Sequence, residues 1–508
     1  MARLFEYQGK ELIDKAGIKI PKGMVVETPK DAEKAAKDIG GSVAIKAQSW
    51  TTSRASSGGI AFADTPEQAA CKAQQILGKK IGNFSVQKIL VEEKLKIKEE
   101  LYCGIIIHER GPGPVLIFNR KGGSGIEQRS KSLDMDIDIM RGLKPYQAAN
   151  LLRKTGFRGN ILVKIASVLV KLYDTAKKYE ARSAEINPIV ITEDDEVIAA
   201  DCRITIDDNA VFRHPELGIE IARELSSPPT PLDKVAHDVE FNDYRGTFYF
   251  IRMEHDYKKG EGVIGFHGAG GGGSMMSMDA LLKEGFRIAN FCDTSGNPPA
   301  SKVYRAARII LSQKGIDGYF GSGSGVASQE QIHSARGLVK AFRETNLNIP
   351  AVIRLGGNME DEAVEILHKF TEELPAPVEG YKRDDPVSFC AERLSELIKN
   401  YKPGESVSLK KKKHPSKLYS FKTVTNGIVT FDHSICTNCE NKVCIKECVP
   451  RILKEEQGLP VLNTTREEAA RGKCTECLAC ELECEKIGKF SARIDLPIPG
   501  LDKIRTSG

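Results

Sequence analysis

Short apolar runs alternate with polar stretches through the first 225 residues. The runs with strand composition lie at residues 42–48, 86–95, 100–108, 114–119 and 188–192. Residues 145–180 instead repeat their apolar positions at the helical period, with many Lys and Arg between them. We therefore predict an α+β domain over residues 1–225, in two lobes.

A second pattern begins after a turn-rich stretch at residues 224–234. Between residues 245 and 400, a strand-like run, a glycine-rich or polar loop and a helical pattern follow one another four times. Successive βα units of this kind are typical of a parallel, doubly wound sheet. The sequence therefore predicts an α/β domain over residues 245–400.

A basic linker and a cysteine-dense module follow the α/β domain. Residues 401–425 are polar and include four consecutive lysines, Lys410–Lys413. This run either docks an acidic partner or forms a solvated hinge, and the composition favours the hinge. The module over residues 426–492 contains eight of the thirteen cysteines, so we expect a small separate domain there.

Length and charge narrow the class of protein. A chain of 508 residues is too long for one hydrophobic core, and three or four folding units are expected. The net charge of +5 is spread over 74 basic and 69 acidic residues, which argues against a nucleic-acid partner. The start of the chain lacks the apolar stretch of a secretory signal, and Lys164 and Lys171 interrupt its most apolar helical pattern. We expect a cytoplasmic protein with no membrane partner.

The eight clustered cysteines form two runs of four. The second run has gaps of two, two and three residues, which resembles bacterial two-cluster ferredoxins. The resemblance covers residues 426–492 and implies two [4Fe–4S] clusters, one held by Cys436, Cys439, Cys444 and Cys484 and the other by Cys474, Cys477, Cys480 and Cys448. A pair of zinc sites is the first alternative and a disulfide framework the second, and the spacing favours the clusters over both.

Charged residues of the N-terminal domain are placed to bind a nucleotide and a metal ion. Lys46 lies in a predicted strand, and the following loop holds Arg54 among small residues, so both cations can face phosphates. Asn187 and Asp201 are 14 residues apart, which suits two adjacent antiparallel strands and an Mg²⁺ site built from their oxygens. Three acidic residues flank another strand: Glu92, Glu93 and Glu100.

Six segments resemble the β subunit of ADP-forming succinyl-CoA synthetase in their order and spacing. They lie at residues 4–12, 44–48, 89–93, 98–102, 184–192 and 207–217, and the resemblance extends to about residue 400. That family has an ATP-grasp fold followed by a flavodoxin-like ligase domain. The resemblance implies phosphate contacts from Lys46 and Arg54, Mg²⁺ ligation by Asn187 and Asp201, and an adenine pocket at Glu92, Glu93 and Glu100. Ser53 and Ala55 flank Arg54 in the nucleotide-binding loop, where the family has glycine.

The segment Gly265–Gly273 follows a predicted strand and opens a helix. We expect an anion-binding loop there that includes Gly268 and Gly270, and its spacing argues against a dinucleotide site. In the resembling family this helix faces a phosphohistidine of the α subunit, and Asn stands where this chain has His267. His267 is the candidate catalytic residue, which binds substrate, relays a proton or is phosphorylated, or else is a neutral residue hydrogen-bonded to backbone. The segment that replaces a substrate-contacting stretch of the family includes Gly323, Ser324 and Gly325.

The resemblance implies the nucleotide-binding subunit of an ADP-forming acyl-CoA synthetase, an acid–thiol ligase, with a fused ferredoxin-like domain. Its expected cofactors are ATP or ADP, Mg²⁺ and two [4Fe–4S] clusters. The expected partners are an α-type subunit that binds CoA and a redox partner such as a 2-oxoacid:ferredoxin oxidoreductase. An alternative is a protein in which ATP hydrolysis gates electron transfer without thioester formation. A third is an electron-transfer scaffold on a degenerate ATP-grasp domain.

Overall fold

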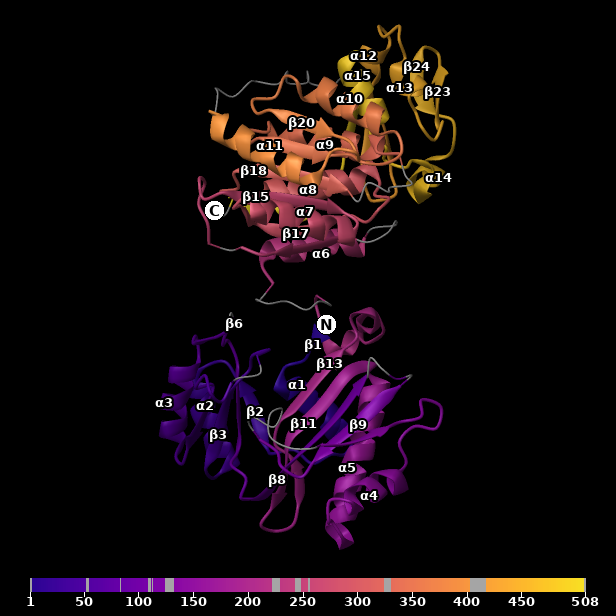
Figure 1. The fold of residues 1–508 in the computed structure, drawn as a ribbon. Helices are drawn as coiled ribbons and strands as arrows, with labels where there is room; N and C mark the ends of the chain where they lie inside the picture. The colour runs from indigo at the N-terminus through magenta and orange to yellow at the C-terminus, as the bar shows by residue number, and fades with distance from the viewer. Residues whose placement is uncertain are drawn as a thin grey trace. The chain divides into compact units, whose positions relative to one another are not determined.

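The computed structural model describes residues 2–51, 54–82, 84–107, 111, 113–123, 132–221, 229–242, 248–254, 256–323, 330–402 and 417–506. The chain forms two compact units, Met1–Pro228 and Pro229–Gly508, and each is described by itself (Figure 1). None of the helices in the described ranges is both long enough and apolar enough to cross a membrane.

The smaller lobe of the first unit is a four-stranded antiparallel sheet. Its order is β2 (Gly23–Val26), β7 (Ile89–Glu93), β3 (Val43–Ala47) and β4 (Ile60–Ala63). Helices α2 (Pro29–Ile39) and α3 (Pro66–Ile76) pack on this sheet, and each begins with a threonine cap followed by proline. A two-stranded ribbon, β5 (Lys80–Ile81) with β6 (Phe84–Ser85), follows α3.

The larger lobe is a seven-stranded antiparallel sheet. Its order is β1 (Ala2–Arg3), β13 (Cys202–Ile206), β11 (Ala181–Thr192), β8 (Ile97–Ile107), β9 (Pro114–Asn119) and β10 (Leu133–Asp136), with β12 (Val197–Ala199) paired to β11. The helices of this lobe are α1 (Glu6–Lys15), α4 (Pro145–Arg153) and α5 (Gly159–Lys178), and the short 3₁₀ helices Asp208–Arg213 and Pro215–Leu217 follow β13. The predicted strands and the helical stretch of this half are confirmed.

The second unit contains a mostly parallel sheet. Its order is β14 (Tyr249–Arg252), β17 (Asn290–Asp293), β15 (Val263–Ala269), β18 (Gly318–Gly323), β19 (Ala351–Arg354) and β20 (Val378–Tyr381), with β16 (Arg287–Ile288) paired to β15 and only β14 antiparallel to its neighbour. From β17 to β20 this is the 2-1-3-4-5 order of flavodoxin-like sheets, whose switch point lies between β15 and β18. The helices are α6 (Pro231–Phe241), α7 (Gly271–Lys283), α8 (Ala300–Leu311), α9 (Ile332–Thr345), α10 (Glu360–Thr371) and α11 (Val387–Asn400).

A C-terminal module packs on this α/β domain. It contains a three-stranded sheet of β21 (Leu418–Lys422), β22 (Ile428–Asp432) and β25 (Ala492–Asp495), a hairpin of β23 (Leu453–Glu456) and β24 (Leu459–Leu462), and the short helices α12 (His433–Cys436), α13 (Val443–Lys446), α14 (Arg466–Glu468), α15 (Ala479–Lys486) and α16 (Leu501–Thr506). The π-helical turn Ala469–Lys473 follows α14. One hydrophobic core runs through the domain and the module, and Figure 1 shows the module in yellow beside α9 and α10.

The predicted linker differs from the structure at its end. β21 lies inside the range 401–425, because Leu418–Lys422 pairs with β22 and buries Phe421. The four consecutive lysines of the linker lie outside the described residues.

Candidate functional site

Lys46 of β3 lies in a buried network of opposite charges. Its Nζ is 3.1 Å from Glu6 Oε1 and 2.5 Å from Glu92 Oε1, and it donates a 2.7 Å hydrogen bond to the carbonyl of Ala200. Lys10 joins the network from the same helix as Glu6, because its Nζ is 2.9 Å from Glu6 and 2.5 Å from Glu92. The network therefore connects the two lobes of the first unit.

Arg54 extends this network to Asp201. Its Nη1 lies 2.7 Å from Glu6 Oε2, and its Nη2 lies 2.7 Å from Asp201 Oδ2. A further hydrogen bond of 3.2 Å joins Nη1 to the carbonyl of Ala47. The two predicted phosphate-binding cations thus share Glu6, and one of them holds a predicted Mg²⁺ ligand.

The mutual pairing decides the protonation of these groups. Burial alone would raise the pKa of Glu6, but the charges of Lys10, Lys46 and Arg54 hold it well below its usual range. Burial would lower the pKa of Lys46, but the carboxylates of Glu6 and Glu92 raise it instead. Burial raises the pKa of Asp201, and the Glu6 charge adds to that rise. The two cations therefore remain charged.

Glu6 and Lys10 were not among the residues predicted from the sequence. Both side chains are buried in α1, four residues apart, although each is of a type that is almost never fully buried without a partner. The available signal was an acidic and a basic residue four positions apart, in the same short helix as Leu12 and Ile13.

The predicted acidic residues take different positions. Glu92 has one carboxylate oxygen on Lys10 and the other on Lys46, so it lies beside a predicted phosphate-binding cation. Glu93 accepts a 2.9 Å hydrogen bond from the backbone of Lys22. Ser53 lies outside the described residues, and Ala55 is exposed.

The two predicted Mg²⁺ ligands lie on neighbouring strands. Ile186 of β11 is paired with Cys202 of β13, so Asn187 and Asp201 are next to each other across the antiparallel pair, as the spacing predicted. Asn187 Oδ1 accepts a 2.7 Å hydrogen bond from the backbone of Gly123, and a carboxylate oxygen of Glu100 lies against the same glycine. This set of amide and carboxylate oxygens has the chemistry that Mg²⁺ prefers.

The expectation that His267 lies in an anion-binding loop is wrong. His267 belongs to β15 and is 5% exposed, because this strand is buried in the parallel sheet and continues to Ala269. The glycines of the strand permit close packing instead, since a Cβ on Gly268 would lie 2.0 Å from Ser274 Oγ of α7. The turn into the helix occurs at Gly270, whose φ is +95° and whose N–H donates to Asp293.

His267 has hydrogen-bond partners on both ring nitrogens. Nδ1 lies 2.5 Å from the hydroxyl of Tyr319, and Nε2 lies 3.3 Å from Thr294 Oγ1, which also donates to the carbonyl of Gly268. Burial lowers the pKa of His267 to about 4, so the ring is neutral near pH 7. The arrangement fits the alternative of a neutral hydrogen-bonded residue, except that its partners are side chains of β18 and of the residue after β17 instead of backbone. Gly323 ends β18, whereas Ser324 and Gly325 lie outside the described residues.

The eight clustered thiols fall into two groups in space. Burial raises the pKa of Cys444 to about 12, and the nearby thiols of Cys484, Cys436 and Cys439 act in the same direction. Burial also raises the pKa of Cys480, and the thiols that act on it in the same direction are, largest first, those of Cys477, Cys474, Cys448 and, from the other group, Cys444. These groups coincide with the two predicted ligand sets, which we call the first thiol set (Cys436, Cys439, Cys444, Cys484) and the second thiol set (Cys474, Cys477, Cys480, Cys448).

Hydrogen bonds and a cavity accompany these sets. The thiol of Cys436 donates to Ser491 Oγ at 3.2 Å, and the backbone of Ala492 donates to Cys484 Sγ at 3.4 Å. The second thiol set lines one small cavity of about 20 Å³ together with apolar side chains and Glu476. Buried thiols with hydrogen bonds to sulfur fit a [4Fe–4S] site.

The cysteines carry no disulfide, and single-ion sites are absent from the described part of the chain. All thirteen thiols are free. Within those described ranges, no group of three or more His, Cys, Asp or Glu side chains is arranged to hold one metal ion. The four thiolates of a cluster each bind a different iron, so they lie farther apart than the ligands of a single ion.

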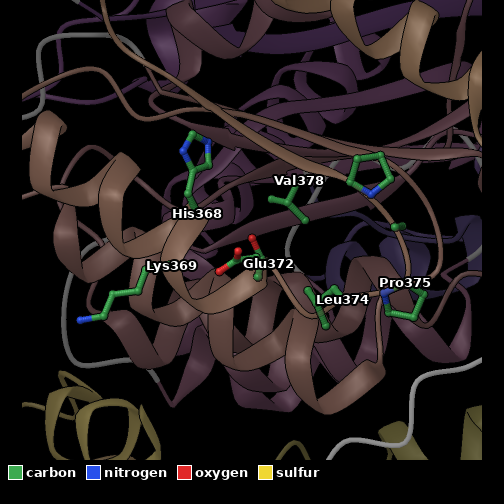
Figure 2. A pocket seen from close by; sticks show the side chains of 9 residues that line it. His368, Lys369, Glu372, Leu374, Pro375 and Val378 are labelled. Atoms are coloured by element: carbon green, nitrogen blue, oxygen red, sulfur yellow. The ribbon is translucent and has the colours of Figure 1, made fainter. Parts of the chain in front are cut away.

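A pocket that is separate from the thiol sets lies beside β20, the strand at one edge of the α/β sheet. Figure 2 shows His368, Lys369 and Glu372 from the end of α10 on its rim, with Pro375 and Val378 from the following loop and strand. It lies at the amino end of β20, whereas ligands of such sheets bind at the carboxyl ends of the strands. His368 is also occupied, since its Nε2 accepts a 3.0 Å hydrogen bond from the backbone of Gly380.

Two family models match parts of the chain. A model of the ATP-grasp domain family matches residues 3–191, and a model described as ATP citrate lyase citrate-binding matches residues 258–394. The fold is similar to that of ATP citrate lyase from Methanothrix soehngenii in complex with citrate and coenzyme A, with a TM-score of 0.64, 17% identity, and coverage of 78% of this chain and 99% of that one.

Relatives found by sequence have a higher identity to this chain than that ATP citrate lyase structure has. The β subunit of the GDP-forming succinate–CoA ligase of Thermus thermophilus is 35% identical over 370 residues, which cover 72% of this chain and 93% of the relative. The β subunit of the ADP-forming succinate–CoA ligase of Methanothermobacter thermautotrophicus is 31% identical over 405 residues, which cover 78% of this chain and all of the relative. The chain therefore belongs to the β-subunit family of succinate–CoA ligases, which are ATP-grasp acid–thiol ligases.

Proposed function

We propose that the chain is the nucleotide-binding subunit of an ADP-forming acyl-CoA synthetase that carries a two-cluster [4Fe–4S] module for electron transfer. Family membership supports the ligase half of this proposal. The redox half rests on one observation, the grouping of eight thiols, seven of them buried, into two sets of four.

The charge network supplies the nucleotide chemistry. Lys46 and Arg54 would bind the phosphates, and Asn187 and Asp201 would hold the Mg²⁺ that neutralises charge on the transferred phosphoryl group. Arg54 is paired with Glu6 and Asp201, so binding of phosphates by Arg54 would require it to exchange these carboxylates.

The acid substrate would bind at the switch point between β15 and β18. The N-terminus of α7 follows β15 there, and free N–H groups at a helix N-terminus favour an anionic carboxylate. The relatives are named for succinate and one matching family for citrate, so we propose an acid with two or more carboxyl groups. CoA would be supplied by an α-type partner subunit, because the curated relatives are β subunits.

A second candidate function is favoured by the packing of the module. Its core is continuous with that of the α/β domain, so the predicted cluster ligands are joined directly to the ligase helices. ATP hydrolysis that gates electron transfer, without thioester formation, is compatible with this contact. The redox partner in either case would be a donor or acceptor such as a 2-oxoacid:ferredoxin oxidoreductase.

One assay separates these functions. The full chain is purified without oxygen in complex with its α-type partner and is screened with succinate, citrate and other carboxylates for ADP release that requires CoA. CoA-dependent ADP release with one acid is the expected result. ATP turnover that needs a reduced redox partner, with no ADP release for any acid, contradicts the ligase function and supports the second candidate.

A further inference from the structure

Two buried carboxylates lie next to ligands of the second thiol set. Glu476 precedes Cys477, its side chain is fully buried, and it lines the same cavity as the four thiols. Glu481 follows Cys480 and is 6% exposed. A buried carboxylate is costly unless it is paired, so the partners of these two groups matter for the site.

Each of the two carboxylates forms an ion pair with a cation of the α/β domain. Arg305 of α8 lies 3.8 Å from Glu476 and also donates to the carbonyls of Pro497 and Thr425 in the module. Lys340 of α9 lies 2.7 Å from Glu481, and burial, which alone would lower its pKa, is outweighed by its carboxylate partners. Both cations are almost completely buried, at 6% and 4% exposure of their side chains.

Glu476 is held firmly in this position. Its oxygens accept hydrogen bonds from the hydroxyl and the backbone of Thr425, at 2.7 to 3.1 Å, and from the hydroxyl of Thr423. Glu476 has a φ of +53°, in the left-handed region, so the backbone turns at this residue between Cys474 and Cys477. The Arg305 contact is therefore part of a built arrangement rather than a mobile surface pair.

We propose that Arg305 and Lys340 are positioning residues of the ligase domain that raise the reduction potential of the cluster held by the second thiol set. This inference rests on the proposed function, because it requires that the cluster is present. Addition of one electron makes a cluster more negative, and a buried positive charge nearby favours the reduced form. The α/β domain would thereby tune one cluster of the module, in addition to anchoring it.

The test is a redox titration of the full chain, loaded with iron and sulfide and followed by EPR. Arg305→Met should lower the midpoint potential of one of the two clusters, and Glu476→Gln should raise the same one. Arg305→Lys keeps the positive charge but loses the guanidinium fork, so its midpoint should stay close to wild type. Arg287→Met is the matched control, because Arg287 pairs with Glu254 and Glu261 instead.

The outcomes separate failure of the proposed redox function from failure of this inference alone. Wild-type chain that binds no iron–sulfur cluster contradicts the proposed redox function together with this inference. Two clusters whose potentials are unchanged in Arg305→Met and in Glu476→Gln overturn the inference alone. An equal fall in Arg305→Met and Arg305→Lys also overturns it, since geometry rather than charge would then be responsible. If Arg305→Met fails to fold, Lys340→Met and Glu476→Gln carry the same test.

Discussion

The substitution Glu6→Gln tests the charge network of the nucleotide-binding unit. Glu6 lies 2.9 Å from Lys10, 3.1 Å from Lys46 and 2.7 Å from Arg54, and its side chain is 1% exposed. Glutamine keeps the shape of the side chain and removes its charge. Three buried cations are then left with two carboxylates.

The structure sets the expected size of this effect. Loss of one partner of a buried ion pair costs about 3–5 kcal/mol, because the remaining charge is desolvated without compensation. In a unit of this size, each kcal/mol lowers the unfolding midpoint by about 2–4 °C. The transition of the N-terminal unit should therefore fall by about 6–20 °C. Mg–ATP should stabilise the variant more than the wild type, since phosphate replaces the missing negative charge.

Differential scanning calorimetry of the full chain, with and without Mg–ATP, measures both effects. Glu11→Gln is the control, because Glu11 is an exposed residue of the same helix. The low pKa of Glu6 adds a pH signature: its contribution is complete above an unfolded pKa of about 4.3 and is lost as the pH falls towards the folded pKa. A Glu6→Gln midpoint equal to that of the control would refute the reasoning.

Three further substitutions test other parts of the account. His267→Gln should cost about 1–3 kcal/mol at pH 7, because the buried hydroxyl of Tyr319 loses its partner. Wild type should also lose about 3 kcal/mol of stability between pH 6.5 and pH 4, as the unfolded histidine takes up a proton that the folded one does not, and urea titrations should show this loss only in wild type. Asp201→Asn should abolish Mg²⁺-dependent ATP turnover, and unchanged turnover would show that the metal assignment is wrong. Cys477→Ser should lose one cluster and half of the bound iron, whereas Cys202→Ser, in the nucleotide-binding unit, should keep all of it.

Much of the architecture could be predicted because its strands are apolar and buried. The runs that became β3, β7, β8, β9 and β11 were visible for that reason. A fifth βα unit, β20 with α11, was missed. β20 has only four residues, all partly exposed, at the edge of the sheet, so it lacks the apolar run that marked the other strands.

The site was harder to predict because burial is a property of the fold. His267 stands among glycines, which suggested a loop, but those glycines allow α7 to pack closely on a strand. Glu6 and Lys10 are ordinary surface residue types, and only the closure of two lobes around them makes them a buried pair. The two thiol sets could be predicted because their grouping follows short local spacings in the sequence.

The most direct test of the central claim is iron, zinc and acid-labile sulfide analysis of the full chain purified without oxygen. The account predicts about eight irons and eight sulfides per chain, with the EPR signals of two [4Fe–4S] clusters on reduction. Zinc bound in place of iron, with no labile sulfide, would contradict it.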